Sequence, residues 1–156
     1  MTSRTTHRLA LCVGLLALPT LAACGDDDQA TVAEWTEAAN TICGDINAAR
    51  DEAATDAFPS EGETVTVEHL QAFYETFEPD FRAAIERMGE LDRPAEIADE
   101  VDGFVTAGRE FANYMAAASA DDTIAENDLA ADGDVEAVRA FEKAGPNLDL
   151  TVCEGG

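Results

Sequence analysis

The chain has 156 residues, 33 of them acidic and nine Lys or Arg, and its formal net charge at pH 7 is −24. So negative a chain repels phosphate backbones and anionic headgroups, which argues against nucleic acid and bare lipid surfaces as partners. The simplest interpretation of the acidity is a solvated surface. The more specific interpretation is a surface that binds basic proteins or divalent cations.

The N-terminus has the order of a secretory signal. Two arginines precede a nearly all-apolar stretch, residues 9–18, that is too short to span a bilayer. Leu21-Ala22-Ala23-Cys24 follows and resembles the lipobox of bacterial lipoproteins. The resemblance implies removal of residues 1–23 as a signal peptide, acylation of Cys24 with lipid such as palmitate, and a membrane anchor on the extracytoplasmic face. The alternative is an ordinary signal peptide that leaves Cys24 as a plain thiol.

Cleavage would leave one small domain on a short tether. The removed piece carries two arginines and no acid, so the net charge falls from −24 to −26. Residues 24–30 are then a lipidated cysteine and an acidic tether, and residues 31–156 are long enough for a single domain with its own core.

The cysteine count fits an acylated Cys24. Cys24, Cys43 and Cys153 remain after cleavage, and three thiols are awkward in an oxidising compartment unless one is otherwise occupied. If Cys24 is acylated, Cys43 and Cys153 remain as a pair, and their bridge would contribute about 4–5 kcal/mol on the chain-entropy model. A metal site is a poor alternative, because these cysteines and His69 lack any ligand spacing.

Apolar residues recur every three or four positions in the first half of the domain, which predicts two long helices. The first runs from about Val32 to Ala54. The second begins after Thr66, whose hydroxyl can cap it, and runs to about Leu91. Pro79 lies inside the second pattern and lacks a backbone N–H, so we expect a kink or a split there.

The second half predicts one more long helix and one short one. The long helix starts at Pro94 and reaches Ala118, and residues 119–134 are expected to be a loop with a helical turn near 124–129. A short fourth helix follows and stops at Gly145-Pro146. Residues 148–153 alternate like a strand without a partner, so we expect an extended tail pinned by its cysteine. The predicted fold is therefore all-α: three long helices and a short fourth, kinked near Pro79, with a disulfide-pinned C-terminal tail.

Aromatic residues in the second helix have two interpretations. Their helical spacing is more often typical of a core than of a ligand site. A kinked helix, however, can open a gap in a bundle, so a pocket for an apolar ligand near Pro79 is the alternative. Phe77, Phe81 and Phe104 are its expected lining.

An acidic group in the second half resembles a calcium loop only superficially. It comprises Asp128, Asp132, Asp134 and Glu136, but the Ala130-Ala131 pair interrupts the spacing that such a loop requires. We therefore favour a solvated loop and predict no metal site.

Catalytic motifs are missing from the sequence. His69 is the only histidine left after cleavage, and no nucleophile elbow, zinc-binding pair or phosphate-cradling loop occurs. We therefore predict that the protein is not an enzyme and needs no cofactor.

The first helix resembles a pattern in small lipoproteins of high-GC Gram-positive bacteria. It carries Ala39-Asn40-Thr41-Ile42-Cys43, then Asn47 and Arg50; Leu91-Asp92-Arg93-Pro94 follows, and a cysteine tail closes the chain. The resemblance implies a helical bundle with a Cys43–Cys153 bridge and implies no catalytic residues.

These expectations combine into one functional prediction. The protein is predicted to be a lipid-anchored, extracytoplasmic binding or interaction module of the cell envelope, with basic envelope proteins or divalent cations as partners. The alternative is a solute- or cation-binding lipoprotein with a pocket near the Pro79 kink.

Overall fold

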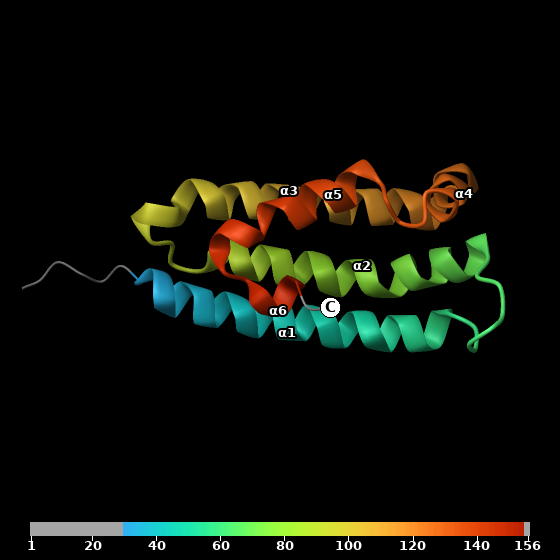
Figure 1. Cartoon of the computed structure of the whole chain (residues 1–156), viewed down its shortest axis with the longest axis horizontal. Coiled ribbons are helices and arrows are strands. Elements are labelled where there is room, and N and C mark those ends of the chain that lie inside the picture. Colours follow the sequence, from blue (N-terminus) through green and yellow to red (C-terminus); the bar gives the residue numbers. More distant parts are fainter. Residues whose placement is uncertain (1–29, 155–156) are drawn as a thin grey trace, which may run out of the picture.

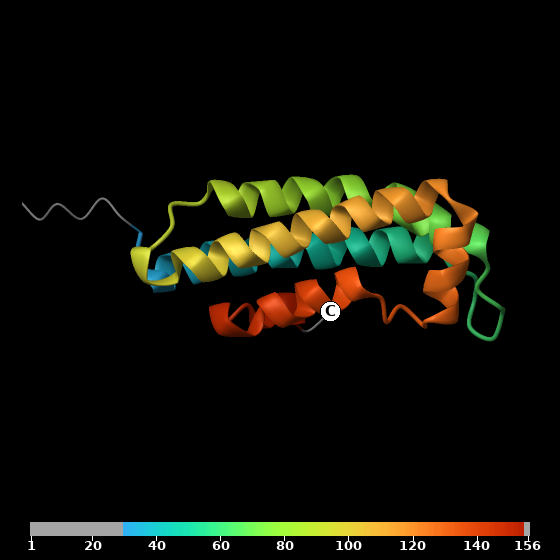
Figure 2. The ribbon, with the colours of Figure 1, turned by 90° about the horizontal axis from the view of Figure 1, so that it is seen from above.

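The computed structural model describes residues 30–154, and these residues form helices and no strands. Cys24 and the predicted signal peptide and tether up to residue 29 lie outside them. Three long helices lie side by side along the length of the molecule, α5 runs along α3, and α4 lies across one end (Figures 1 and 2). The elements are α1 (Val32–Ala57), α2 (Val67–Glu90), η1 (Ala95–Ile97), α3 (Ala98–Ala120), α4 (Asp122–Ala130), α5 (Glu136–Ala144), η2 (Pro146–Leu148) and α6 (Thr151–Glu154). The predicted all-α bundle is confirmed.

Capping boxes fix the starts of α1 and α2. Glu34 N–H donates to Thr31 Oγ1 at 3.3 Å, and Thr31 N–H donates back to Glu34 Oε2 at 2.9 Å. At α2, the Thr66 N–H donates to His69 Nδ1 at 3.2 Å while Thr66 Oγ1 accepts from the His69 N–H at 3.5 Å. Each box satisfies backbone N–H groups that would otherwise lack partners. Thr66 is the predicted cap, and His69 here has a structural role.

Pro79 bends α2 without splitting it. The helix is continuous from Val67 to Glu90, and its axis changes direction in the N-terminal half (Figure 1). The missing N–H of Pro79 leaves the Glu75 carbonyl without its helical donor, which is the physical reason for a kink.

The start of α3 differs from the prediction. Pro94 has extended backbone angles (φ −61°, ψ 137°) and precedes η1, and α3 itself begins at Ala98. The Ile97 N–H donates to the Pro94 carbonyl at 3.2 Å, so a turn of 3₁₀ helix leads into α3.

Residues 119–134 are more helical than predicted: the expected helical turn near 124–129 is part of a longer helix. They contain α4, a nine-residue helix capped by Asp121, whose Oδ1 accepts from the Thr123 and Ile124 N–H groups at 2.8 and 3.2 Å. The helix is rich in small and polar residues, so its apolar periodicity is weak in the sequence. The loop after it contains Asp132 and Gly133 at positive φ (52° and 74°).

The C-terminal tail is helical rather than extended, which corrects a second prediction. Asp149, at φ 52° in the left-handed region, separates η2 from α6. Leu148 and Leu150 are both buried, whereas Val152, the next apolar residue of the alternating pattern, is exposed. Alternating apolar residues in this segment therefore do not indicate a strand.

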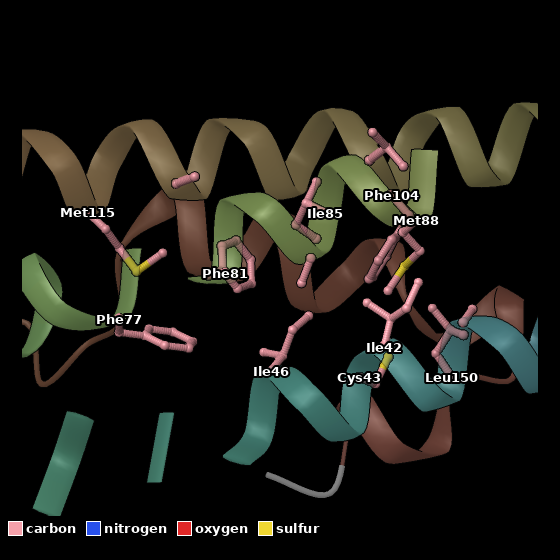
Figure 3. Packing of buried hydrophobic residues seen from close by; sticks show 14 of the residues in the cluster. Ile42, Cys43, Ile46, Phe77, Phe81, Ile85, Met88, Phe104, Met115 and Leu150 are labelled. Carbon is pink, nitrogen blue, oxygen red and sulfur yellow. The ribbon is translucent and has the colours of Figure 1, made fainter. Parts of the chain in front are cut away.

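The long helices share one hydrophobic core (Figure 3). Helices α2 and α3 approach closely at Gly108, where an added Cβ would lie 2.6 Å from Ile85 Cδ1. No helix among the described residues is long and apolar enough to cross a membrane.

Candidate functional site

The predicted disulfide is confirmed. Cys43 and Cys153 are bridged, with their Cα atoms 5.0 Å apart and 110 positions between them in the sequence. Cys43 is buried in the middle of α1, and Cys153 lies in α6. The bridge therefore fastens the last helix of the described chain to the first.

Two asparagines of α1 hold the same tail by its backbone. Asn40 Nδ2 donates to the Asp149 carbonyl at 3.3 Å, and Asn40 Oδ1 accepts from the Val152 N–H at 3.2 Å. Asn47 Nδ2 donates to the Val152 carbonyl at 2.7 Å. Because Asn40, Cys43 and Asn47 follow a three-four spacing, they lie on one helical stripe. We call Asn40, Asn47 and the disulfide the tail clamp.

Phe77, Phe81 and Phe104, the predicted pocket residues, lie in the core. Phe77 and Phe81 reach from α2 into the space between the helices, and Phe104 of α3 lies beside Met88 (Figure 3). Their exposed fractions are 5%, 1% and 1%. Phe77 and Phe81 are in ring contact, with their ring centroids 5.6 Å apart. None of the three lines the surface hollows described below.

Every phenylalanine and tyrosine of the chain belongs to one continuous row of ring contacts. Neighbouring ring centroids in this row are 4.8–6.4 Å apart, a range in which tilted and edge-to-face pairs are favourable. Phe141 of α5 joins the row between α2 and α3. The members are Phe58, Phe73, Tyr74, Phe77, Phe81, Phe104, Phe111, Tyr114 and Phe141.

Asp128 is the buried acidic residue of the described chain and lies at the α4 end of this row. Only 2% of it is exposed, and its Oδ2 accepts a hydrogen bond of 2.6 Å from the Tyr74 hydroxyl. Asp128 also acts on the Tyr114 hydroxyl, whose pKa it helps to raise. We call Asp128, Tyr74 and Tyr114 the carboxylate lock, because it joins α4 to α2 and α3.

The lock shifts the titration of both phenols. Burial, followed by the hydrogen bond to Asp128, raises the pKa of Tyr74 well above its usual value of 10. The same two causes raise the pKa of Tyr114. A phenolate beside a buried carboxylate is unfavourable, so both hydroxyl groups keep their protons and remain donors at neutral pH.

The lock corrects the prediction of a solvated acidic loop. Asp132, Asp134 and Glu136 are exposed as expected, but Asp128 is separated from them by its place on α4. It is in phase with the half-buried Ile124 and the buried Ala125. That phase was the signal in the sequence, and it becomes visible only once α4 is recognised as a helix.

We expect Tyr74→Phe to lower the free energy of unfolding by about 1.5–3 kcal/mol at pH 7, the range for hydrogen bonds to charged groups. Because the folded-state pKa of Tyr74 is raised, its contribution is complete below pH 10 and is lost as the pH rises above that value. Urea unfolding at pH 7 and at pH 11 measures both effects. Tyr114→Phe is the control, with a smaller loss because Tyr114 is less buried; an unchanged stability of Tyr74→Phe would contradict the lock.

The arginines of the described residues are all paired with carboxylates. Arg109 donates to both oxygens of Glu86, from Nε at 2.8 Å and from Nη2 at 2.6 Å, and this bond lowers the pKa of Glu86. Such exposed pairs contribute little stability, but they leave the remaining carboxylates as uncompensated surface charge. The pairs are Arg50–Asp51, Arg82–Glu78, Arg87–Asp45, Arg93–Asp102, Arg109–Glu86 and Arg139–Asp134.

Surface hollows lie at three helix seams. The hollow between α1 and α2 has an alanine floor and is lined by Asp45, Glu52, Asp80 and Arg87. A second lies between the start of α2 and α4. The third lies between α3 and α5 and is lined by Glu110, Tyr114, Glu136, Ala137 and Ala140. Among residues 30–154, no group of three or more His, Cys, Asp or Glu is placed to hold a metal ion.

Comparison with known proteins gives no relative from which a function can be transferred. No protein-family model, curated protein or solved structure shows a significant match to the chain.

Proposed function

We propose that the protein is a lipid-anchored lipoprotein whose helical bundle acts as a binding or interaction module on the extracytoplasmic face of the cell membrane. The observation that carries the proposal is the lipobox-like Leu21-Ala22-Ala23-Cys24, followed within seven residues by the capped start of a long helix. Two acyl chains on Cys24 would give stable anchoring, whereas one is marginal.

The shape of the bundle supports presentation away from the membrane. The start of α1 and the α2–α3 connection lie at one end of the molecule, and the α1–α2 loop and α4 lie at the other (Figures 1 and 2). α1 has 26 residues, so it spans about 39 Å at 1.5 Å per residue. A short tether at the first end would therefore hold the carboxylate lock and α4 well above the membrane surface.

The charge supports a basic partner. With the arginines of residues 30–154 engaged in ion pairs, the unpaired carboxylates dominate the field around the domain. This field repels anionic headgroups and attracts cationic protein surfaces. Membrane attachment would then depend on the lipid alone, and the acidic surface would remain available for basic envelope proteins. No catalytic step forms part of this proposal.

The anchor is tested by Cys24→Ala. We expect the wild-type protein in the membrane fraction, released only by detergent, and the variant in the soluble extracytoplasmic fraction. Asp27→Asn is the matched control, because it changes the tether and leaves the thiol; it should stay with the membrane. Intact-mass measurement should show acyl chains on the wild type and none on the variant. A Cys24→Ala protein that remains in the membrane fraction would refute the lipid anchor.

A further inference from the structure

Helix α5 is held to the bundle less firmly than the helices around it. None of its residues is fully buried, whereas α1, α2 and α3 each bury six or more. With nine residues it is also too short to be stable as an isolated helix in water. Its position therefore depends on the few side chains that it docks, and Phe141 is the largest of them.

Phe141 fills a slot between aromatic side chains of α2 and α3. Its ring centroid lies 5.3 Å from that of Phe81, edge to face, 4.8 Å from that of Phe104, and 6.0 Å from that of Phe111. One ring from α5 therefore occupies the space beside Phe81 and Phe104, two of the three residues predicted to line a pocket. The third predicted residue, Phe77, is in ring contact with Phe81.

The segments on either side of α5 are fixed, and α5 itself is joined to them by turns. Before it, the carboxylate lock holds α4 to α2 through the hydrogen bond from Tyr74 to Asp128. After it, the tail clamp holds residues 149–153 to α1 through a covalent bond and three hydrogen bonds. The turn that precedes α5 contains Asp132 and Gly133 at positive φ, and Gly145 ends α5. We call α5 the strap, because the segments on both of its sides are attached to the long helices.

The hollow between α3 and α5 is lined by residues of the same two helix segments that carry Phe111 and Phe141. It has a volume of about 350 Å³ and is lined by Ala137 and Ala140, which neighbour Phe141 on α5. On α3 it is lined by Glu110 and Tyr114, the first adjacent to Phe111 and the second one helical turn from it. Glu136 completes it. Two carboxylates and an aromatic ring form an environment that favours a positively charged group.

We propose that α5 is a displaceable cover over a binding site for a small aromatic ring that carries a positive charge. The ring takes the place of Phe141 against Phe81, Phe104 and Phe111, and its ammonium group lies in the hollow near Glu110 and Glu136. This proposal deepens the proposed binding function, because it names a ligand class. A ligand that replaces Phe141 selects the open state of the strap, as in other sites that are covered in the unliganded protein.

Three probes with the same ring and different charges test the site. Benzylamine, benzyl alcohol and benzoate are titrated into the purified Cys24→Ala chain, and binding is followed by chemical-shift changes in NMR. We expect saturable binding, with an affinity that falls from benzylamine to benzyl alcohol to benzoate. We expect Phe141→Ala to bind benzyl alcohol at least tenfold more tightly than the parent, because the competing ring is gone. If this variant does not fold, Phe141→Leu replaces it, with a smaller gain.

Charge is tested separately from the ring. Glu110→Gln should reduce the preference for benzylamine over benzyl alcohol several-fold. Glu142→Gln, on an exposed residue of α5 outside the hollow, should leave that preference unchanged. Hydrogen exchange in the parent should be at least tenfold faster in α5 than in α3, and benzylamine should slow it in α5.

Two results would overturn the proposal. The first is saturable binding of none of the probes by the parent chain, which would make Phe141 a permanent part of the core. The second is equal exchange rates in α5 and α3. Neither result changes the membrane fractionation of Cys24→Ala, so failure of this site and failure of the lipid anchor are distinguishable.

Discussion

Loss of the disulfide is expected to lower the free energy of unfolding by about 4–5 kcal/mol, the largest effect of a single contact in this protein. The bridge joins residues 110 positions apart, so it removes from the unfolded chain the entropy of a very long loop. Cys153→Ala is the cleaner variant. Cys43 is fully buried in α1, and replacing it would add the cost of a cavity.

Urea unfolding of the Cys24→Ala chain with and without reductant measures this contribution. Reductant should lower the midpoint of the parent to that of Cys153→Ala and should leave Cys153→Ala itself unchanged. If reduction and substitution both change the unfolding free energy by less than about 1 kcal/mol, the long-loop argument is wrong for this chain. The three hydrogen bonds of the tail clamp would then account for the docking of the tail.

The sequence predicts the tail clamp only in part. Because Asn40, Cys43 and Asn47 follow a three-four spacing, they share one face of a helix. The cysteine count pairs Cys43 with Cys153 on the condition that Cys24 is acylated. The partners of the asparagines are backbone groups of Asp149 and Val152. Backbone groups carry no side-chain signal in a sequence. Their positions follow from the left-handed backbone conformation at Asp149. The alternating apolar residues of the tail predicted an extended segment instead.

The long helices were predictable because each buries a wide apolar stripe, and burial of such a stripe dominates helix stability in a folded protein. Helix α4 was not, because it is held by a cap and by a buried polar residue rather than by such a stripe. Asp121 supplies the cap, and Asp128 supplies the contact to Tyr74. A carboxylate on the inward face of a short helix looks in the sequence like one more acidic residue of a loop.

The predicted pocket shows that sequence periodicity has the same limit when it is used to predict a binding site. Helical spacing places Phe77 and Phe81 on one face of α2, and it cannot say whether a ligand or another part of the chain packs against them. In the structure the ring of Phe141 packs against Phe81 and Phe104. Phe141 is far from Phe81 and Phe104 in the sequence and lies on α5. The position of α5 depends on the segments on both of its sides, which the carboxylate lock and the tail clamp hold in place.

The second large effect is expected for Phe81→Ala, which should lower the free energy of unfolding by about 3–5 kcal/mol. Phe81 is 1% exposed, and its ring contacts those of Phe77, Phe111 and Phe141, so truncation leaves a cavity at the meeting point of α2, α3 and α5. Urea unfolding of the variant against its parent measures the loss. Phe73→Ala is the control: Phe73 also contacts three rings but is only half-buried, so its loss should be smaller.

The Phe81→Ala variant distinguishes a plain hydrophobic core from a covered binding site, because Phe81 is part of both arrangements. If the row of rings is only a core, Phe81→Ala is less stable and binds no probe differently from its parent. If α5 covers a site, Phe81→Ala also loses the edge-to-face partner of the bound ring, so benzyl alcohol should bind it more weakly than it binds Phe141→Ala. The two variants remove the same number of atoms from neighbouring positions. The ratio of their affinities therefore reports whether the ligand takes the place of Phe141 or occupies whichever cavity a truncation creates, and a ratio near one would favour the plain core.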